Sequence, residues 1–209
     1  MKRLLLVFTV LLGASGAASG QNVSGFYLGA SIGSLSSTGQ WDFPGSGTGS
    51  DIDTGPNGWF GAANAGLNFQ SGNTVFGVEG DVGSGPLKGT SPCLSTNDCK
   101  NEVRGLATFR GRLGLVNQTA LVYATAGAAG GAIKATMNSG TGGPSGDQTK
   151  VQVGWSAGLG VASPASHGWA WKAEWLHFDL GSTEYEVAGT TTNIKFKGDI
   201  LRVGVDYRF

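Results

Sequence analysis

Residues 194–209 read IKFKGDILRVGVDYRF. From Leu201 onward every odd position is apolar, and the residues between them are Arg, Gly, Asp and Arg. Strict alternation with a period of two predicts a β-strand that has one apolar and one polar face. The apolar positions are Leu201, Val203, Val205, Tyr207 and Phe209.

A closing strand that ends on an aromatic residue resembles the C-terminal signature of Gram-negative outer-membrane β-barrels. In that family the barrel-assembly machinery reads this signature during biogenesis. The resemblance implies that the same five apolar residues, from Leu201 to Phe209, form an assembly signal. The motif alone leaves one alternative open, which is the last strand of a soluble barrel.

Composition favours a β-protein that has no need of a charged exterior. Lys plus Arg and Asp plus Glu both number 14, so the net charge is zero and nothing favours nucleic acid as a partner. Charged residues make up 13% of the 209 residues, about half the share of a typical soluble domain. Six Trp, ten Phe and four Tyr argue that the 38 Gly do not signal disorder.

Residues 1–20 are expected to be a signal peptide, and residues 21–209 a single β-barrel domain. Lys2 and Arg3 give a positive start, and an apolar core and a run of small residues follow. That core is too short to cross a bilayer as a helix. We therefore expect Sec-type export, removal of the segment, and membrane insertion only as a β-barrel.

Alternating segments predict strands at residues 24–33, 58–69, 74–82, 103–116, 120–133, 151–161, 169–180 and 194–209. Long connections rich in Gly, Ser and Thr are expected at residues 34–57, 83–101, 134–149 and 181–193. Long and short connections alternate strictly, as they do in outer-membrane barrels with short periplasmic turns. The sequence thus predicts an all-β fold, an eight-stranded antiparallel up-and-down transmembrane β-barrel. In the strand expected at residues 120–133 the sequence does not decide which alternate residues form the apolar face. We choose Val122, Ala124, Ala126 and Ala128.

Three phrases resemble one family: SGFYLGA at residues 24–30, RGRLG at residues 110–114, and KAEWLHFDLG at residues 172–181. They are similar to the small OmpA-barrel-like and opacity-type outer-membrane proteins, especially the alphaproteobacterial surface-antigen branch. The resemblance covers essentially the whole mature chain. It implies an integral protein of the Gram-negative outer membrane with a structural and surface-interaction role. Its expected partners are outer-membrane lipid, lipopolysaccharide, and an extracellular ligand bound through the loops.

Parity places a set of charged side chains on the face opposite the lipid. They are Glu79, Asp81, Arg104, Arg110, Arg112, Lys172, Glu174, Arg202 and Asp206. Facing side chains on adjacent antiparallel strands lie within about 5 Å, so an acid of strand 74–82 should pair with Arg110 or Arg112. An unpaired charge inside the barrel would cost several kcal/mol. We expect a network of ion pairs that plugs the lumen; the alternative is a small passive, porin-like pore.

The only two cysteines, Cys93 and Cys99, both lie in the segment 83–101. Export exposes them to an oxidising compartment, which predicts a disulfide between them. Metal binding is the weaker alternative, because two thiols are an incomplete site.

Catalytic signals are weak, and we expect no enzyme, no metal site and no cofactor. The Gly-x-Ser-x-Gly spacing occurs around Ser31 and Ser156, but in the middle of expected strands rather than at a strand-to-helix turn. A weak alternative is a barrel hydrolase whose site near the outer rim contains His177 and Asp179. The sequence has neither a His-x-Ser motif nor an acidic cluster to support it.

Overall fold

The computed structural model describes residues 22–42, 52–93, 97–139, 145–163, 166–187 and 190–209. Its regular elements are the strands β1 (Gly25–Asp42), β2 (Ile52–Asp53), β3 (Gly58–Ser71), β4 (Thr74–Ser84), β5 (Leu87–Cys93), β6 (Asn97–Val116), β7 (Leu121–Ser139), β8 (Gly146–Ala162), β9 (Trp169–Val187) and β10 (Thr190–Arg208). This part of the chain contains no helix long and apolar enough to cross a membrane.

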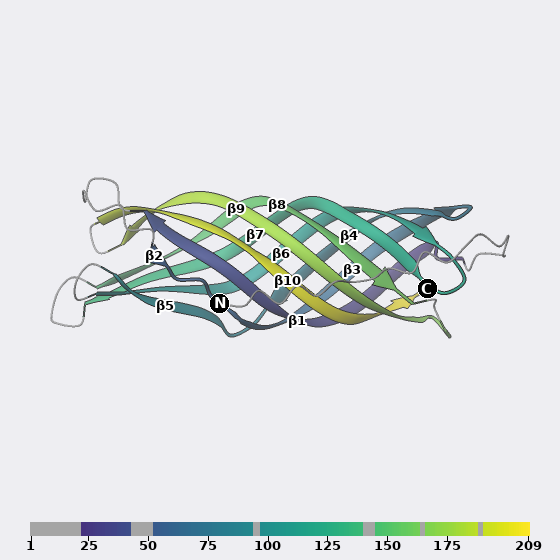
Figure 1. Ribbon diagram of the computed structural model, residues 1–209, viewed down its shortest axis with the longest axis horizontal. Coiled ribbons are helices and arrows are strands. Elements are labelled where there is room, and N and C mark those ends of the chain that lie inside the picture. The colour runs from purple at the N-terminus through teal and green to yellow at the C-terminus, as the bar shows by residue number, and fades with distance from the viewer. Residues whose placement is uncertain (1–21, 43–51, 94–96, 140–144, 164–165, 188–189) are drawn as a thin grey trace, which may run out of the picture.

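All strands belong to one antiparallel sheet that closes on itself (Figure 1). Neighbours follow the order β10-β9-β8-β7-β6-β4-β3-β1, and β10 also pairs with β1 from Tyr27–Arg208 to Asp42–Asn193. The short strands β2 and β5 pair with β1 and β6 near one end. Among the described residues the sheet therefore has ten strands. The predicted count of eight is wrong, because β2 and β5 form inside segments whose composition predicts loops.

The long strands also run further than their composition predicts. β1 continues to Asp42 although residues 34–57 were expected to be a loop, and β9 continues to Val187. In the added part of β1, Leu35, Ser37, Gly39 and Trp41 are buried and alternate with more exposed residues. This segment contains Ser, Gly and Thr as well as apolar residues, so its composition is typical of a loop. Its backbone nevertheless pairs with β10.

Two irregularities change which face a residue occupies. The β6–β7 register shifts between Val103 and Gly105, and the β9–β10 register shifts between Lys195 and Lys197. The second shift lies opposite Gly181, whose φ of 69° is in the left-handed region that glycine adopts readily. A β-bulge adds one residue to one strand, so the side chains beyond it move to the other face.

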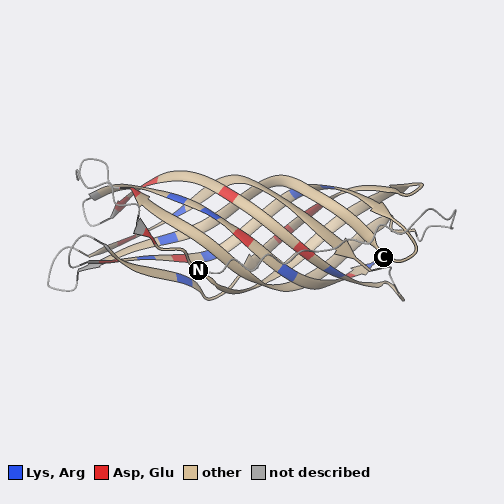
Figure 2. Ribbon diagram, in the orientation of Figure 1, with Lys and Arg blue, Asp and Glu red and all other residues tan. Residues whose placement is uncertain are grey.

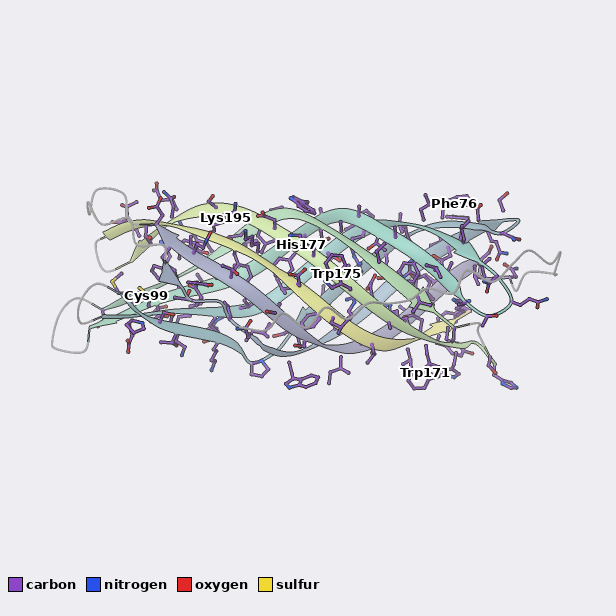
Figure 3. The ribbon with its side chains drawn as sticks, in the orientation of Figure 1. Phe76, Cys99, Trp171, Trp175, His177 and Lys195 are labelled. Carbon is purple, nitrogen blue, oxygen red and sulfur yellow. The ribbon has the colours of Figure 1, made fainter. Side chains whose placement is uncertain are left out.

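The outer surface of the closed sheet has two zones. Large exposed apolar side chains come from each of β1, β3, β4, β6, β7, β8, β9 and β10. The expected face of strand 120–133, Val122 with Ala124, Ala126 and Ala128, is among the exposed residues. Along β10 the exposed residues change from Leu201 to Asp199 and Lys195. Figure 3 places Lys195 and Cys99 toward one end of the molecule, and Trp171 and Phe76 toward the other.

Candidate functional site: a buried charge cluster in the lumen

Eight of the charged residues that parity places inside are buried in the space that the sheet encloses, the lumen. Figure 2 shows acidic and basic positions along the strands of the sheet. Four of the eight are acids and four are bases, and each is at most 7% exposed. β4 supplies Glu79 and Asp81, β6 Arg110 and Arg112, β9 Lys172 and Glu174, and β10 Arg202 and Asp206. We call these eight residues the charge cluster.

Glu79 lies at the centre of the charge cluster. Its two carboxylate oxygens lie 2.7 Å from Arg110 Nη2 and 2.7 Å from Arg112 Nη2. Lys172 Nζ is 3.2 Å from Oε2, and the Tyr27 hydroxyl donates to the same oxygen over 2.9 Å. Arg202 Nη2 lies 3.5 Å from Glu79 Oε1, so three buried arginines and a buried lysine share one carboxylate. Removal of one partner from such a buried group leaves an uncompensated charge.

Ion pairs also cross the lumen from wall to wall. β4 and β6 are neighbours, as are β9 and β10, but strands β7 and β8 separate the two pairs on one side and β3 and β1 on the other. Arg110 Nη1 lies 2.9 Å from Glu174 Oε1, and Arg202 Nη2 donates to Asp81 Oδ2 over 3.4 Å. Side chains from facing walls therefore contact each other directly at this level.

The expected pairing between adjacent strands is present as well. Arg110 Nη2 lies 2.7 Å from Asp81 Oδ2, while Lys172 pairs with Asp206 over 3.0 Å. Arg202 Nε donates to Glu174 over 2.7 Å. Lys172 and Arg202 thus pair across the β9–β10 boundary rather than with the acid on their own strand.

Two tyrosines that sequence reasoning left unassigned hold Arg112 in place. The Arg112 guanidinium lies 4.0 Å from the ring centre of Tyr123 and 5.3 Å from that of Tyr27. A cation beside an aromatic face is stabilised by the ring quadrupole. Each ring lies over a glycine, Tyr27 over Gly66 and Tyr123 over Gly160, where no other residue would leave room. Inward parity on strands 24–33 and 120–133 was the available signal for both tyrosines.

Arg104 is the exception among the predicted lumen charges, and its prediction was wrong. It is exposed on the outer surface. Leu106, Arg110 and Arg112 face inward at even positions, but the bulge next to Val103 breaks this parity. Without Arg104 the cluster carries four positive and four negative groups, an exact balance of charge.

Apolar layers lie on both sides of the charge cluster. Toward the short turns, Val23, Val75, Val116, Leu121, Tyr123 and Ala162 form one buried group. On the other side lies a larger group that includes Phe60, Leu106, Leu176, Phe178 and Ile200. An internal cavity between this group and Asp81 has a volume of about 10 Å³. That volume holds no more than about one water molecule.

A third buried group lies at the end of the sheet that has the polar exterior. It consists of Trp41, Cys99, Ala135, Met137, Tyr185 and Ile194. Trp41 Nε1 donates to Thr54 Oγ1 over 3.0 Å, and Asn101 Nδ2 donates to the same oxygen over 2.7 Å. Burial raises the pKa of the Tyr185 phenol above its ordinary value.

The structure gives Cys99 as disulfide-bonded, whereas its pairing with Cys93 stays a prediction. Cys99 is buried and disulfide-bonded, and the sequence offers Cys93 as the only other cysteine. The two residues lie on the paired strands β5 and β6, where Cys93 is opposite Asn97 and Ser91 opposite Cys99. We expect thiol labelling of unreduced, denatured protein to find no free cysteine. Reduction should leave the sheet folded, because β6 keeps its pairing with β7; labelling of two thiols would contradict the bond.

The remaining predicted residues occupy these places. Leu201, Val203, Tyr207 and Phe209 are exposed, Val205 is half-buried, and the Phe209 N–H donates to the Phe26 carbonyl over 3.0 Å. Their role as an assembly signal stays a prediction. Ser31 and Ser156 are buried in the middle of β1 and β8. His177 pairs with Asp199 over 3.1 Å on the outer surface.

Comparison with known proteins agrees with this architecture. Residues 4–209 match the family described as outer membrane protein beta-barrel domain. The 25 kDa outer-membrane immunogenic protein of Brucella abortus is 34% identical over 154 residues, which cover 74% of this chain and 67% of the relative. The 22 kDa outer membrane protein of Rhizobium leguminosarum is 26% identical over 152 residues, 73% of this chain and 67% of the relative.

Among solved structures, the outer membrane protein OprG from Pseudomonas aeruginosa aligns with a TM-score of 0.58. The alignment covers 91% of this chain and 98% of OprG at 12% identity, so the likeness shows the fold alone. The match to the family model extends over nearly the whole chain, and the Brucella relative supports it independently. The chain therefore belongs to the outer membrane protein β-barrel domain family and is an outer-membrane β-barrel protein of the surface-antigen kind.

Proposed function

We propose that this chain forms a transmembrane barrel with a closed lumen, and that it serves the outer membrane as a structural and surface-interaction protein. The barrel consists of the eight long strands, while β2 and β5 extend it at one end. The observation that carries the proposal is the charge cluster, whose ion pairs join facing walls. A barrel of this size has an interior that side chains can just fill.

The surface pattern supports an orientation. The β3–β4, β6–β7 and β8–β9 connections lie at one end, and the first two are short turns at Gly72 and at Asn117–Ala120. At the opposite end the exterior is polar, as in Gln40, Lys100, Glu184 and Lys195. Outer-membrane barrels have short turns in the periplasm and longer connections outside. We therefore place the polar end, with β2 and β5, outside the cell, where an extracellular ligand could bind.

The packing in the lumen argues against the passive pore. An ion crossing the barrel would have to separate the charge cluster and also pass three apolar groups, around Val116, Phe178 and Tyr185. Apolar constrictions exclude water and ions. A structural role requires only that the barrel be stable and its outer end be presented.

Planar-bilayer recording of the refolded protein tests the proposal. Preparations should first show the change in gel mobility on heating that marks a folded barrel. We expect no steady conductance above the bare bilayer at neutral pH. A stable, ohmic conductance that grows with the number of inserted molecules would contradict the closed lumen and would favour the pore.

A further inference from the structure

Backbone pairing between β8 and β9 ends before either strand does. The ladder stops at the pair Trp155–Asp179, although both strands continue toward the polar end of the sheet. The segments beyond the ladder are residues 146–154 of β8 and 180–187 of β9. On their other edges these strands stay paired, with β7 and with β10. The wall therefore has one stretch in which neighbouring strands lack a ladder, and we call these two segments the seam.

A β-bulge in β9 marks the start of the seam. Two residues, Leu180 and Gly181, occupy the place opposite Phe196 alone. Asp179 Oδ1 accepts a hydrogen bond from the Gly181 N–H over 2.8 Å and so holds the bulge. Immediately before it the strands are in close contact, since a Cβ at Gly154 would lie 2.7 Å from Leu180 Cα. Bulges bend the strand that contains them and end its pairing, so the bulge accounts for the seam.

Side chains cross the seam where the backbone does not. Lys150 Nζ donates to the Glu184 carbonyl oxygen over 2.5 Å, and also lies 5.5 Å from the ring centre of the buried Tyr185. Gln148 Oε1 accepts from the Glu186 N–H over 3.1 Å. One side chain thus supplies the donor, and another the acceptor, that a neighbouring strand supplies elsewhere in the sheet. A strand edge of this kind is a template for pairing with another chain.

The exterior of the seam is apolar on one edge and acidic on the other. On β8, Val151 is 71% exposed and Val153 is 70% exposed. On β9, Glu184 and Glu186 are exposed, and no ion pair within the described part of the chain involves either of them. Continuing the register past the bulge puts Val151 opposite Glu184, so the two kinds of side chain face each other across the seam.

We infer that the seam binds an extended, basic segment of a polypeptide partner, which inserts as a strand between β8 and β9 and carries Lys or Arg at every second position. In such strand addition the backbone hydrogen bonds provide affinity and the alternate side chains provide specificity. The aliphatic stem of an outward Lys or Arg packs on Val151, and its charged end reaches Glu184. An acidic strand would bring like charges together. The inference rests on the proposed function only in placing the seam outside the cell.

The variants that test the seam follow from its geometry. Glu184→Gln combined with Glu186→Gln removes both charges and keeps the size of the side chains. Glu102→Gln is the matched control, because Glu102 is a half-exposed glutamate on β6, away from the seam. Deletion of Gly181 removes the extra residue of the bulge, which leaves one residue opposite Phe196 and lets the ladder continue along β8.

The measurement is fluorescence anisotropy of labelled peptides, titrated with heat-modifiable protein refolded in phosphatidylcholine nanodiscs; empty discs are the blank. One peptide alternates Lys and Thr, a second alternates Glu and Thr, and a third is the Lys peptide with methyl groups on alternate backbone nitrogens. We expect the wild type and Glu102→Gln to bind the Lys peptide alone. The double glutamine variant should bind it about tenfold more weakly, as for two exposed ion pairs. The variant without Gly181 should not bind it.

Four results would overturn the inference. Failure of the wild type to bind any peptide would show that Gln148 and Lys150 keep the seam closed. Equal binding by the wild type and the double glutamine variant would remove the acids as the anchor. Equal binding of the methylated peptide would show attraction between charges without strand pairing, and this result needs no variant to fold. Equal binding by the variant without Gly181 would place the peptide elsewhere. Conductance is measured separately, so failure here is distinct from failure of the closed lumen.

Discussion

Replacement of Glu79 by glutamine is expected to lower the free energy of unfolding by about 3–5 kcal/mol, the range for a buried ion pair that loses one partner. Glutamine keeps the size of the side chain and part of its hydrogen bonding. It removes the negative charge that Arg110, Arg112 and Lys172 share within 3.2 Å. Those cations are buried, so neither water nor another acid can replace the carboxylate without rearrangement.

Urea titration of the barrel refolded in lipid vesicles measures this change. Glu102→Gln is the matched control, because Glu102 lies outside the lumen on the neighbouring strand β6 and is half-exposed. The control should stay within about 0.5 kcal/mol of the wild type, as exposed substitutions usually do. If Glu79→Gln matched the control, the cluster would not depend on its central acid.

Gly66→Ala is expected to cost about 1–3 kcal/mol, although it adds a single methyl group, because overpacking of a tight interior is costly. The new Cβ would overlap the ring of Tyr27. To make room the ring must move, and its hydroxyl then loses the hydrogen bond to Glu79 Oε2. The same movement withdraws the ring from the Arg112 guanidinium.

Gly80→Ala separates this effect from the general cost of replacing glycine in a strand. A Cβ at Gly80 would lie 3.8 Å from the Thr108 carbonyl oxygen and 3.9 Å from the Phe109 ring, which is ordinary contact. Alanine should therefore be tolerated there, and the two variants should differ in the same urea titration. Equal stability of Gly66→Ala and Gly80→Ala would show that the Tyr27 ring is not held over Gly66.

Local alternation was sufficient to predict which face most charged residues occupy. Glu79, Arg110 and Arg202 lie in regular stretches of strand, where a period of two carries the face from one residue to the next. The predicted face of Arg104 was wrong because a bulge adds one residue to β6. Nothing in the sequence around Val103 marks the position of this register shift. The prediction of the strand ends was wrong for a different reason. In the added part of β1, Ser37 and Gly39 occupy buried positions as often as apolar residues do, so the apolar alternation is weak there.

The partners within the cluster were beyond the reach of the sequence. Adjacent-strand pairs such as Arg110 with Glu79 follow from short-range register. The contact between Arg110 and Glu174 depends instead on the tilt and stagger of strands on facing walls, which fix the height of each side chain in the lumen. Glu79 therefore could be predicted as an inward acid but not as the centre of the cluster.

A double-mutant cycle between Arg110 and Glu174 tests most directly whether the cluster joins facing walls. The two residues lie 64 positions apart on strands that do not pair, and their closest atoms are 2.9 Å apart. With Arg110→Ala, Glu174→Ala and the double variant in the vesicle unfolding assay, we expect a coupling energy of about 1–3 kcal/mol. Effects that add to within about 0.5 kcal/mol would contradict the contact across the lumen and, with it, the proposal that the charge cluster closes the lumen.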